Sequence, residues 1–184
     1  LDQLKSNYIF RLDCGDLCLS DRLDTQMQFL IENSDICIVG SWVRYVNERS
    51  EDLFELKLPL THEQIKKRMY VRVPFIHSAV LFRTAALKKV GFYSKQYKAA
   101  EDYAFFMRFV EECKTANIPK ILTQVEWNPK GISPSKRMTQ LKSRLSLLLD
   151  NAKFNPYFFY GVLRVILLML IPYNIIESLK KKIY

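Results

Sequence analysis

The chain has 184 residues, of which 49% are hydrophobic and 26% charged, a composition typical of a soluble globular domain with ample material for a core. Its net charge of +9 indicates an anionic partner: nucleic acid, an anionic membrane surface or an anionic substrate. No nucleic-acid-binding signature accompanies the basic residues, so we expect no nucleic-acid partner. The four cysteines have neither zinc-site spacing nor the pattern of a disulfide framework, which indicates a reducing cytoplasm.

The first informative stretch is a short apolar strand, residues 8–12, that runs directly into Asp13, Gly15 and Asp16. In open α/β sheets, ligands bind at the carboxyl ends of the strands, and a glycine there allows an unusual φ or a close backbone approach. Asp13 and Asp16 are therefore predicted to face a cleft and to hold Mg²⁺ or Mn²⁺, which would accept phosphate oxygens. The alternative is a solvent-exposed Asp-Gly turn.

A helix is predicted over residues 20–33, with Ser20 as its N-cap. The side chains predicted to form its buried face are Leu23, Met27, Leu30 and Ile31. Arg22 and Gln26, one turn apart, are assigned to the solvent-exposed face unless a site uses them. A strand follows over residues 36–46, and the acidic, irregular residues 48–59 are predicted to form a loop.

Helices and strands continue to alternate through the middle of the chain. Thr61 and Gln64 have capping-box spacing at the start of a helix that ends near Tyr70. Residues 79–82 are predicted to form a short buried strand, and Gly91 to end the helix that follows it. Further elements are predicted over residues 100–113 (helix) and 118–127 (strand).

The C-terminal part contains an amphipathic helix, residues 135–151, and an apolar run, residues 157–173, that is interrupted by Arg164. This run is shorter than the ~20 apolar residues of a membrane-spanning helix. Its flanking tyrosines and the lysines at 180–182 instead favour a helix that lies in the membrane interface. The alternative is a buried helix–helix contact, such as that of a homodimer.

Several motifs follow one another in a recognisable order. They are Asp13-Cys14-Gly15-Asp16 after a strand, Arg-Leu-x-x-Gln at residues 22–26, Val-Gly-Ser at residues 39–41, and the segments 76–83, 91–93 and 100–103. This order resembles the inverting, nucleotide-sugar-dependent glycosyltransferases of family 2, which have the GT-A fold. The resemblance spans about residues 8–137. It implies an α/β fold: a partial GT-A-like mixed sheet with flanking helices over residues 1–134, followed by amphipathic and apolar, membrane-docking helices over residues 135–184.

The resemblance also implies site residues. Asp102 corresponds to the general base that takes the proton from the acceptor hydroxyl, and burial beside Tyr103 has to raise its pKa against the helix dipole. Glu101 would support this base, while His77 and Tyr103 would bind the acceptor. On the donor side, the resemblance keeps Arg22 near the carboxylates, where it would orient Asp16; Asp13 and Asp16 are the residues predicted to hold the metal. Separately from the resemblance, the basic, Gly/Pro/Ser-rich loop 128–137 is predicted to close over a diphosphate, with Lys130 or Arg137 as counter-charge. The alternative for this loop is a surface linker.

The implied function is transfer of a sugar from a nucleotide-diphosphate donor, a UDP-sugar above all, to a hydroxyl of a glycan or lipid-linked acceptor. Such enzymes act in lipopolysaccharide or capsular polysaccharide synthesis, so we expect a peripheral protein on the cytoplasmic face of a bacterial cell membrane. The resemblance further implies a divalent cation that stabilises the leaving diphosphate.

Two departures from the family pattern leave an alternative open. Family members commonly carry a metal-binding aspartate where Gly15 stands. Their nucleotide-binding half precedes the position of Tyr8, and this chain, which begins at Leu1, is interpreted as a fragment without it. The alternative is an inactive remnant or a non-catalytic, partner-binding module with the same fold. A phosphatase-like hydrolase is disfavoured, because no nucleophile-plus-threonine pattern accompanies the strand.

Overall fold

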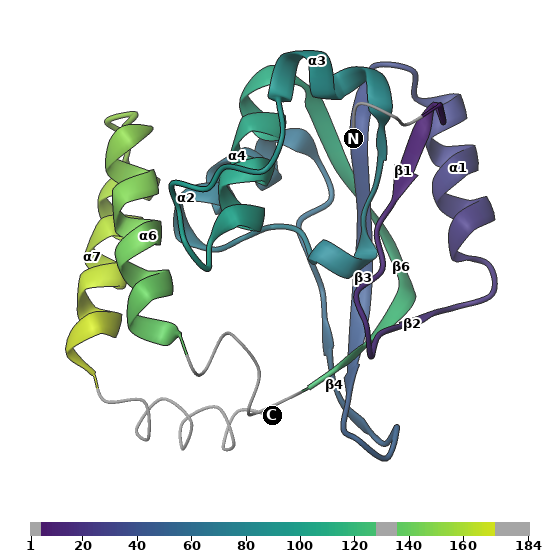
Figure 1. The fold of residues 1–184 in the computed structure, drawn as a ribbon, viewed down its shortest axis with the longest axis horizontal. Coiled ribbons are helices and arrows are strands. Elements are labelled where there is room, and N and C mark those ends of the chain that lie inside the picture. Colours follow the sequence, from purple (N-terminus) through teal and green to yellow (C-terminus); the bar gives the residue numbers. More distant parts are fainter. Residues whose placement is uncertain (1–4, 128–135, 172–184) are drawn as a thin grey trace.

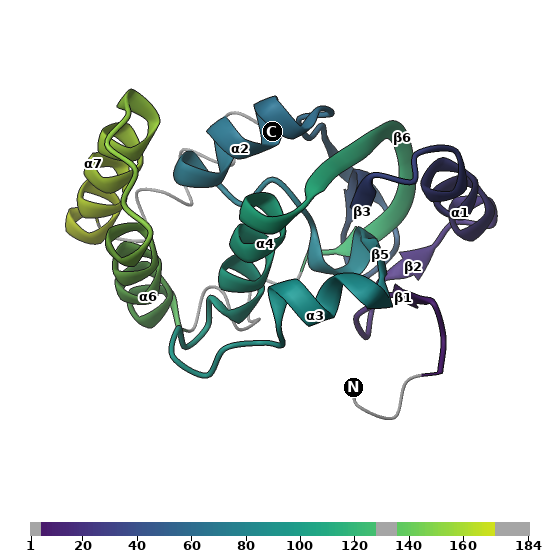
Figure 2. The ribbon, with the colours of Figure 1, turned by 90° about the horizontal axis from the view of Figure 1, so that it is seen from above.

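A mixed sheet forms the centre of the molecule, with helices on both of its faces (Figures 1 and 2). The structure is a computed structural model that describes residues 5–127 and 136–171. The strands are β1 Tyr8–Phe10, β2 Leu17–Cys18, β3 Ile36–Val46, β4 Asp52–Leu56, β5 Leu81–Arg83 and β6 Lys114–Glu126. The helices are α1 Arg22–Glu32, α2 His62–Val71, α3 Leu87–Val90, α4 Glu101–Glu112, α6 Arg137–Asp150 and α7 Pro156–Leu170, with short 3₁₀ turns η1 His77–Ala79 and η2 Thr84–Ala86.

The strand order is β1-β5-β3-β6-β2, and β4 pairs with the C-terminal part of β3. Only β3 and β6 run parallel; every other pair is antiparallel. This arrangement confirms the predicted mixed α/β sheet. The last strand begins at Lys114, earlier than predicted, because Lys114 already pairs with Ile36 at the start of β3.

The prediction of a loop over residues 48–59 is confirmed for residues 48–51 and 57–59 but is wrong for residues 52–56, where β4 pairs with β3 as a hairpin. The acidic residues that suggested a loop are cross-strand partners: Arg44 forms salt bridges with Asp52 and Glu55, both at 3.2 Å. On the same hairpin the ring of Phe54 stacks on that of Tyr45, with centroids 4.7 Å apart. Cross-strand pairing of this kind stabilises a strand that local composition does not favour.

The predicted buried face of the first helix is also corrected. Leu30 is buried, but Leu23 and Ile31 are 50% and 59% exposed. The buried face instead runs through Arg22, Gln26 and Leu30, at i, i+4 and i+8. The hydrophobic periodicity predicts the wrong face because a charged side chain is expected to be exposed. Arg22 can be buried because hydrogen bonds satisfy its guanidinium group.

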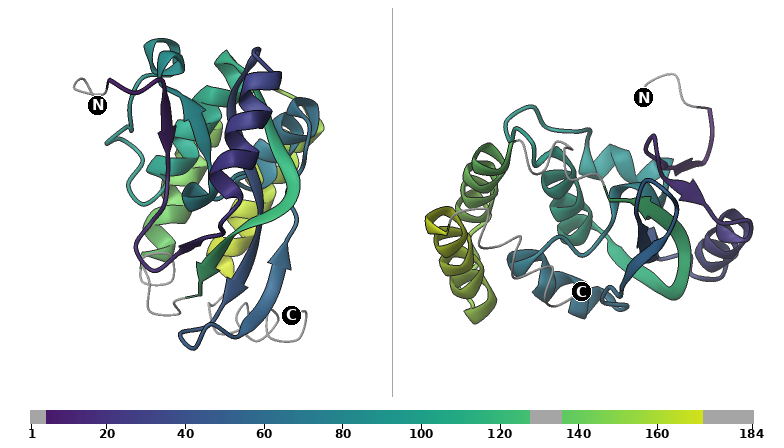
Figure 3. Two further views of the ribbon diagram at one scale, coloured as in Figure 1. Left: turned by 90° about the vertical axis from the view of Figure 1, so that its right-hand side faces the viewer. Right: turned by 90° about the horizontal axis from the view of Figure 1, so that it is seen from below.

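Two apolar clusters lie on opposite faces of the sheet. The smaller one, around Leu30 and Val39, lies between the sheet and α1. The larger one contains the aromatic side chains of α4 and extends through α2 into α6 and α7. Seen from below, α1, the sheet, α4 and the α6–α7 pair follow one another as layers (Figure 3, right). None of the described helices is long and apolar enough to cross a membrane.

Gly161 allows α7 to approach α2 closely. A Cβ at this position would lie 2.1 Å from the carbonyl oxygen of Tyr70 and 2.9 Å from its carbonyl carbon, which are backbone atoms that cannot rotate away. Gly161→Ala is therefore expected to lower the free energy of unfolding by about 1–3 kcal/mol, although alanine is the better helix former. Chemical denaturation checks this, with the exposed Leu163→Ala on the same helix as the control. A more stable Gly161→Ala variant would contradict this packing.

Candidate active site

A tight turn at the end of the first strand presents Asp13. The backbone N–H of Asp16 donates to the carbonyl of Asp13 at 3.2 Å, and Gly15 has φ +95°. A four-residue turn with positive φ at its third position requires glycine or asparagine there. The predicted conformational role of Gly15 is confirmed.

Asp13, His77 and Tyr93 form a hydrogen-bonded chain. Nδ1 of His77 lies 3.0 Å from Oδ2 of Asp13, and Nε2 of His77 lies 2.8 Å from the Tyr93 hydroxyl. A carboxylate only accepts, so the tautomer that pairs His77 with Asp13 has Nδ1 as the donor and Nε2 as the acceptor from the Tyr93 hydroxyl. Nη2 of Arg11 also lies 3.3 Å from Nδ1 of His77. Arg11 donates to the other carboxylate oxygen of Asp13 at 2.8 Å. Asp13 thereby fixes the tautomer and orientation of His77.

Asp102 lies in the first turn of α4, beside this chain. Burial raises the pKa of its carboxyl, against the opposing effects of the Tyr103 backbone N–H, which donates to Oδ1 at 2.7 Å, and of His77. Burial is also the main reason that the pKa of Tyr93 is raised; Arg11 opposes this, while Asp102 and Asp13 add to it. Asp13 and Asp102 therefore both raise the pKa of the Tyr93 hydroxyl. The convergence of Asp13, Asp16 and Asp102 on one cleft stays a prediction.

The segment before α4 is held in a constrained conformation. Ala99 has φ +59°, its N–H donates to Oε1 of Glu101 at 3.0 Å, and its carbonyl accepts from Nε2 of Gln140 at 3.1 Å. A non-glycine residue with this φ persists only where its surroundings impose it. Glu101 thus supports the loop that positions Asp102.

A cavity of about 120 Å³ opens beside Asp102. Its lining residues are Val73, Ala100, Asp102, Tyr103, Gln140, Leu141 and Arg144. Tyr103, a predicted acceptor-binding residue, lines this cavity but is itself buried, and its hydroxyl donates to the carbonyl of Met69. Tyr103 therefore offers its ring face to the cavity wall, with Arg144 5.1 Å from the ring centroid.

Arg22 is fully buried and ties together the backbone segments that carry Asp13 and His77. It donates to the carbonyls of Ser78 at 2.6 Å, Arg11 at 2.9 Å and Val80 at 3.3 Å, and to Oε1 of Gln26 at 3.0 Å. Desolvation lowers its pKa to about 10, and Asp16 is a smaller, opposing influence. Arg22 therefore interacts with the charge of Asp16, but its hydrogen bonds are made to three backbone carbonyls and to Gln26.

Asp16 faces the end of β6, where Oδ1 accepts from the backbone N–H of Glu126 at 3.0 Å. Carboxylate oxygens are the correct ligand type for Mg²⁺ or Mn²⁺, but Arg11 and His77 occupy both oxygens of Asp13. In residues 5–127 and 136–171, no three His, Cys, Asp or Glu side chains are grouped to hold a metal ion. As arranged, these residues do not fit a divalent cation, and the metal site stays a prediction.

Of the two predicted diphosphate-binding cations, the structure describes one, Arg137. Lys130 lies outside the described residues. Arg137 begins α6 and donates to the carbonyls of Leu168 and Ile171 at the end of α7.

Tyr93 and Arg11 are site residues that the sequence did not single out. Tyr93 lies in the segment after Gly91, whose resemblance to the acceptor side of the family was the one available signal. Its ring stacks on Phe105 of α4, with centroids 4.3 Å apart, which fixes its hydroxyl on His77. Arg11 belongs to no motif; it directly follows β1 and reaches Asp13, two residues further along the chain.

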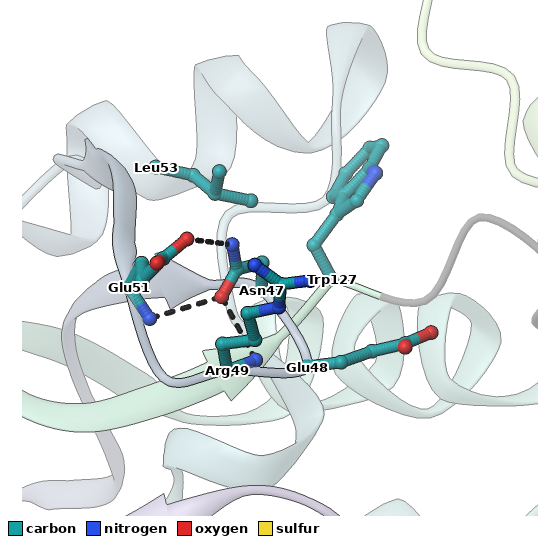
Figure 4. Close-up of a pocket in the computed structure, with 6 residues that line it drawn as sticks. All are labelled: Asn47, Glu48, Arg49, Glu51, Leu53 and Trp127. Carbon is teal, nitrogen blue, oxygen red and sulfur yellow. Dashed lines mark hydrogen bonds between the residues drawn. The ribbon is translucent and has the colours of Figure 1, made fainter.

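A second hollow, of about 340 Å³, lies at the tip of the β3–β4 hairpin (Figure 4). Asn47 closes the turn: its Oδ1 accepts from the N–H groups of Arg49 and Glu51, and its Nδ2 donates to Oε2 of Glu51. Trp127, at the end of β6, forms one wall. None of the predicted site residues lines this hollow, and the hydrogen bonds of Asn47 and Glu51 stabilise the turn itself.

The mixed sheet with helices on both faces is an α/β fold, and it presents carboxylates at a strand end and at a helix start. The chain belongs to the family described as glycosyltransferase-like family 2, whose family model matches residues 1–153. The solved structure of S. aureus TarS 1–349 is similar in fold, with a TM-score of 0.56 and 18% identity over 89% of this chain and 48% of that one.

Curated relatives are glycosyltransferases by name. The amylovoran biosynthesis glycosyltransferase AmsE of Erwinia amylovora is 24% identical over 99% of this chain and 70% of its own length. The Escherichia coli UDP-Gal:alpha-D-GlcNAc-diphosphoundecaprenol beta-1,3-galactosyltransferase is 27% identical over 79% of this chain and 52% of its own. The E. coli O-antigen biosynthesis glycosyltransferase WbnJ is 32% identical over 59% of this chain. This chain spans only 42% of WbnJ.

Proposed function

We propose that this chain carries the acceptor side of an inverting glycosyltransferase of bacterial surface-polysaccharide synthesis. The observation that carries the proposal is the half-buried carboxylate of Asp102 at the edge of a cavity, beside the Asp13–His77–Tyr93 chain. The family and the names of the relatives support a nucleotide-sugar donor, a UDP-sugar first, and a glycan or lipid-linked acceptor.

In the proposed reaction, Asp102 takes the proton from the acceptor hydroxyl while that oxygen attacks C1 of the donor sugar. The new O–C1 bond forms on the face opposite to the diphosphate. In the same step the bond from C1 to the diphosphate oxygen breaks, the nucleoside diphosphate leaves with the electron pair, and the configuration at C1 inverts. A carboxylate whose pKa is raised is the more effective base once it is ionised.

The test is a transfer assay with the full-length protein, a panel of radiolabelled UDP-sugars and a GlcNAc-diphosphate lipid as acceptor. We expect one donor to yield a labelled lipid. A folded protein that transfers none of these sugars would instead support the second candidate, a non-catalytic module. The observation that favours this candidate is the pairing of Asp13 with Arg11 and His77 next to Gly15, where the family carries a further carboxylate.

We further propose that α7 binds the cytoplasmic face of an anionic membrane. Opposite the face that packs on α2, large apolar side chains are exposed on or just before this helix: Phe154, Tyr157, Phe159, Tyr160, Leu163, Ile166, Leu167 and Leu170. Lys180, Lys181 and Lys182 follow in the sequence, which supports an anionic lipid surface over a second copy of the chain as the occupant.

Vesicle co-sedimentation tests this docking. The protein is expected to bind vesicles that contain phosphatidylglycerol, and Leu163→Glu with Leu167→Glu to weaken binding at least fivefold, because both side chains would enter the apolar layer as charges. The matched control is Leu23→Glu with Ile31→Glu on the exposed face of α1. Equal loss in both double variants, or a dimer in sedimentation that only the α7 variant dissociates, would contradict membrane docking.

A further inference from the structure

Three arginines from three different elements meet at the C-terminal end of α2. Arg72 is the C-cap of α2 and directly follows Val71. Arg144 of α6 and Arg164 of α7 both donate to the carbonyl oxygen of Val71, the latter at 3.4 Å. We call these residues, Arg72, Arg144 and Arg164, the arginine cluster.

In residues 5–127 and 136–171, no carboxylate pairs with the arginine cluster. Burial, followed by repulsion from Arg144 and Arg72, lowers the pKa of Arg164 to about 10. Nε of Arg144 is buried and has no hydrogen-bond acceptor. An unpaired, partly desolvated charge is costly, so an anionic ligand would remove a cost that the free protein carries.

Helix capping does not account for three cations at this place. A cation near a helix C-terminus is stabilising, but Arg144 and Arg164 share one carbonyl oxygen, and each added charge repels the others. A diphosphate, in contrast, offers several oxygens and matches the fork of donors on each guanidinium.

One member of the arginine cluster, Arg144, lies beside the proposed base. Arg144 and Asp102 line the same cavity of about 120 Å³. Gln140, also on α6, donates a hydrogen bond to the carbonyl of Ala99 and so connects α6 to the loop before α4. In an acceptor whose sugar is attached to a lipid diphosphate, the reacting hydroxyl and the diphosphate belong to one sugar ring. The base and the anion site of such an acceptor must therefore be neighbours.

We propose that the arginine cluster binds the diphosphate of a lipid-linked sugar acceptor, with the sugar hydroxyl directed to Asp102. The inference rests on the proposed function, and it assigns the acceptor class from this chain's own residues. Arg164 faces the Val71 carbonyl of α2, so the lipid would pass around α7 to reach the exposed apolar side of that helix.

Binding of farnesyl diphosphate to this chain, measured by isothermal titration calorimetry, tests the proposal. We expect saturable binding that weakens at least tenfold in Arg144→Gln. The matched control is Lys142→Gln, which removes the same charge from an exposed position on the same helix and should stay within twofold. Arg144→Lys keeps the charge without the fork, and is also expected to bind more weakly; it remains informative if Arg144→Gln fails to fold by circular dichroism.

Three results would overturn the proposal: no binding to the folded wild-type chain, equal weakening in Arg144→Gln and Lys142→Gln, or competition by UDP at equal affinity, which would assign the arginine cluster to the donor. Inorganic pyrophosphate is expected to bind more weakly than farnesyl diphosphate, because it lacks the lipid. This binding is independent of turnover, so diphosphate binding without sugar transfer would refute the proposed function alone. Transfer to a lipid-diphosphate acceptor that Arg144→Gln does not impair would refute this inference alone.

Discussion

Asp102→Asn is expected to slow sugar transfer by about 10²–10⁴-fold, the usual contribution of a general base. The amide is nearly isosteric with the carboxylate, and its oxygen still accepts the hydrogen bond that the Tyr103 N–H donates to Asp102. The loss should therefore appear in kcat with little change in acceptor KM. The control is Asp24→Asn on the exposed face of α1, which removes a carboxylate far from the cavity.

The same Asp102→Asn variant is expected to be more stable than the wild-type protein at neutral pH. Burial raises the folded-state pKa of Asp102 above its unfolded value, so between these two pKa values the folded state binds more protons. The free energy of unfolding then falls as pH rises through this interval, and the penalty is fully present above it. Asparagine carries no such penalty. Urea titrations should show the two proteins converging below about pH 4. An active variant, or one less stable at pH 7, would contradict a buried catalytic carboxylate.

Arg22→Ala is expected to lower the free energy of unfolding by about 3–5 kcal/mol, a large share of the 5–15 kcal/mol typical of a domain. The substitution removes the donor from three backbone carbonyls and from Gln26, and it empties a fully buried volume. Urea denaturation measures the loss. Arg49→Ala, an exposed arginine on the β3–β4 hairpin, should change the stability by less than about 0.5 kcal/mol.

Arg22→Lys separates stability from positioning. A single ammonium group cannot reach the four acceptors that the guanidinium holds, so the carbonyls of Arg11 and Ser78 should lose their fixed separation. Because these residues flank Asp13 and His77 in the chain, we expect a folded protein with lower kcat. A fully active Arg22→Lys variant would contradict the positioning role of Arg22.

Local signals in the sequence predicted much of this fold. The β-branched and aromatic run at residues 36–46 is β3, and the capping box of Thr61 and Gln64 is present at the start of α2. The positive φ of Gly15 and Gly91 was implied by their place at a turn and a helix end. In each case a few neighbouring residues determine the conformation, so no knowledge of the tertiary structure is needed.

The remaining features depend on partners that are distant in the sequence. Arg22 is buried because the carbonyls of residues 78 and 80, distant in the sequence, accept its hydrogen bonds. The strand β4 forms because Glu55 and Phe54 pair with Arg44 and Tyr45 on β3. Tyr93 reaches His77 only once α4 is packed against the sheet. The arginine cluster likewise unites residues 72, 144 and 164. Such pairings carry no local pattern, so periodicity and composition could not predict them.

The central claim, a single displacement with Asp102 as the base, is tested most directly by the anomeric configuration of the product. Proton NMR of the product formed by the full-length protein from a UDP-α-sugar would report this configuration through the coupling constant of the anomeric proton. The account predicts a β-linked product, which Asp102→Asn no longer forms at a comparable rate. An α-linked product would contradict it, since retention requires a mechanism that one base at the acceptor cannot provide.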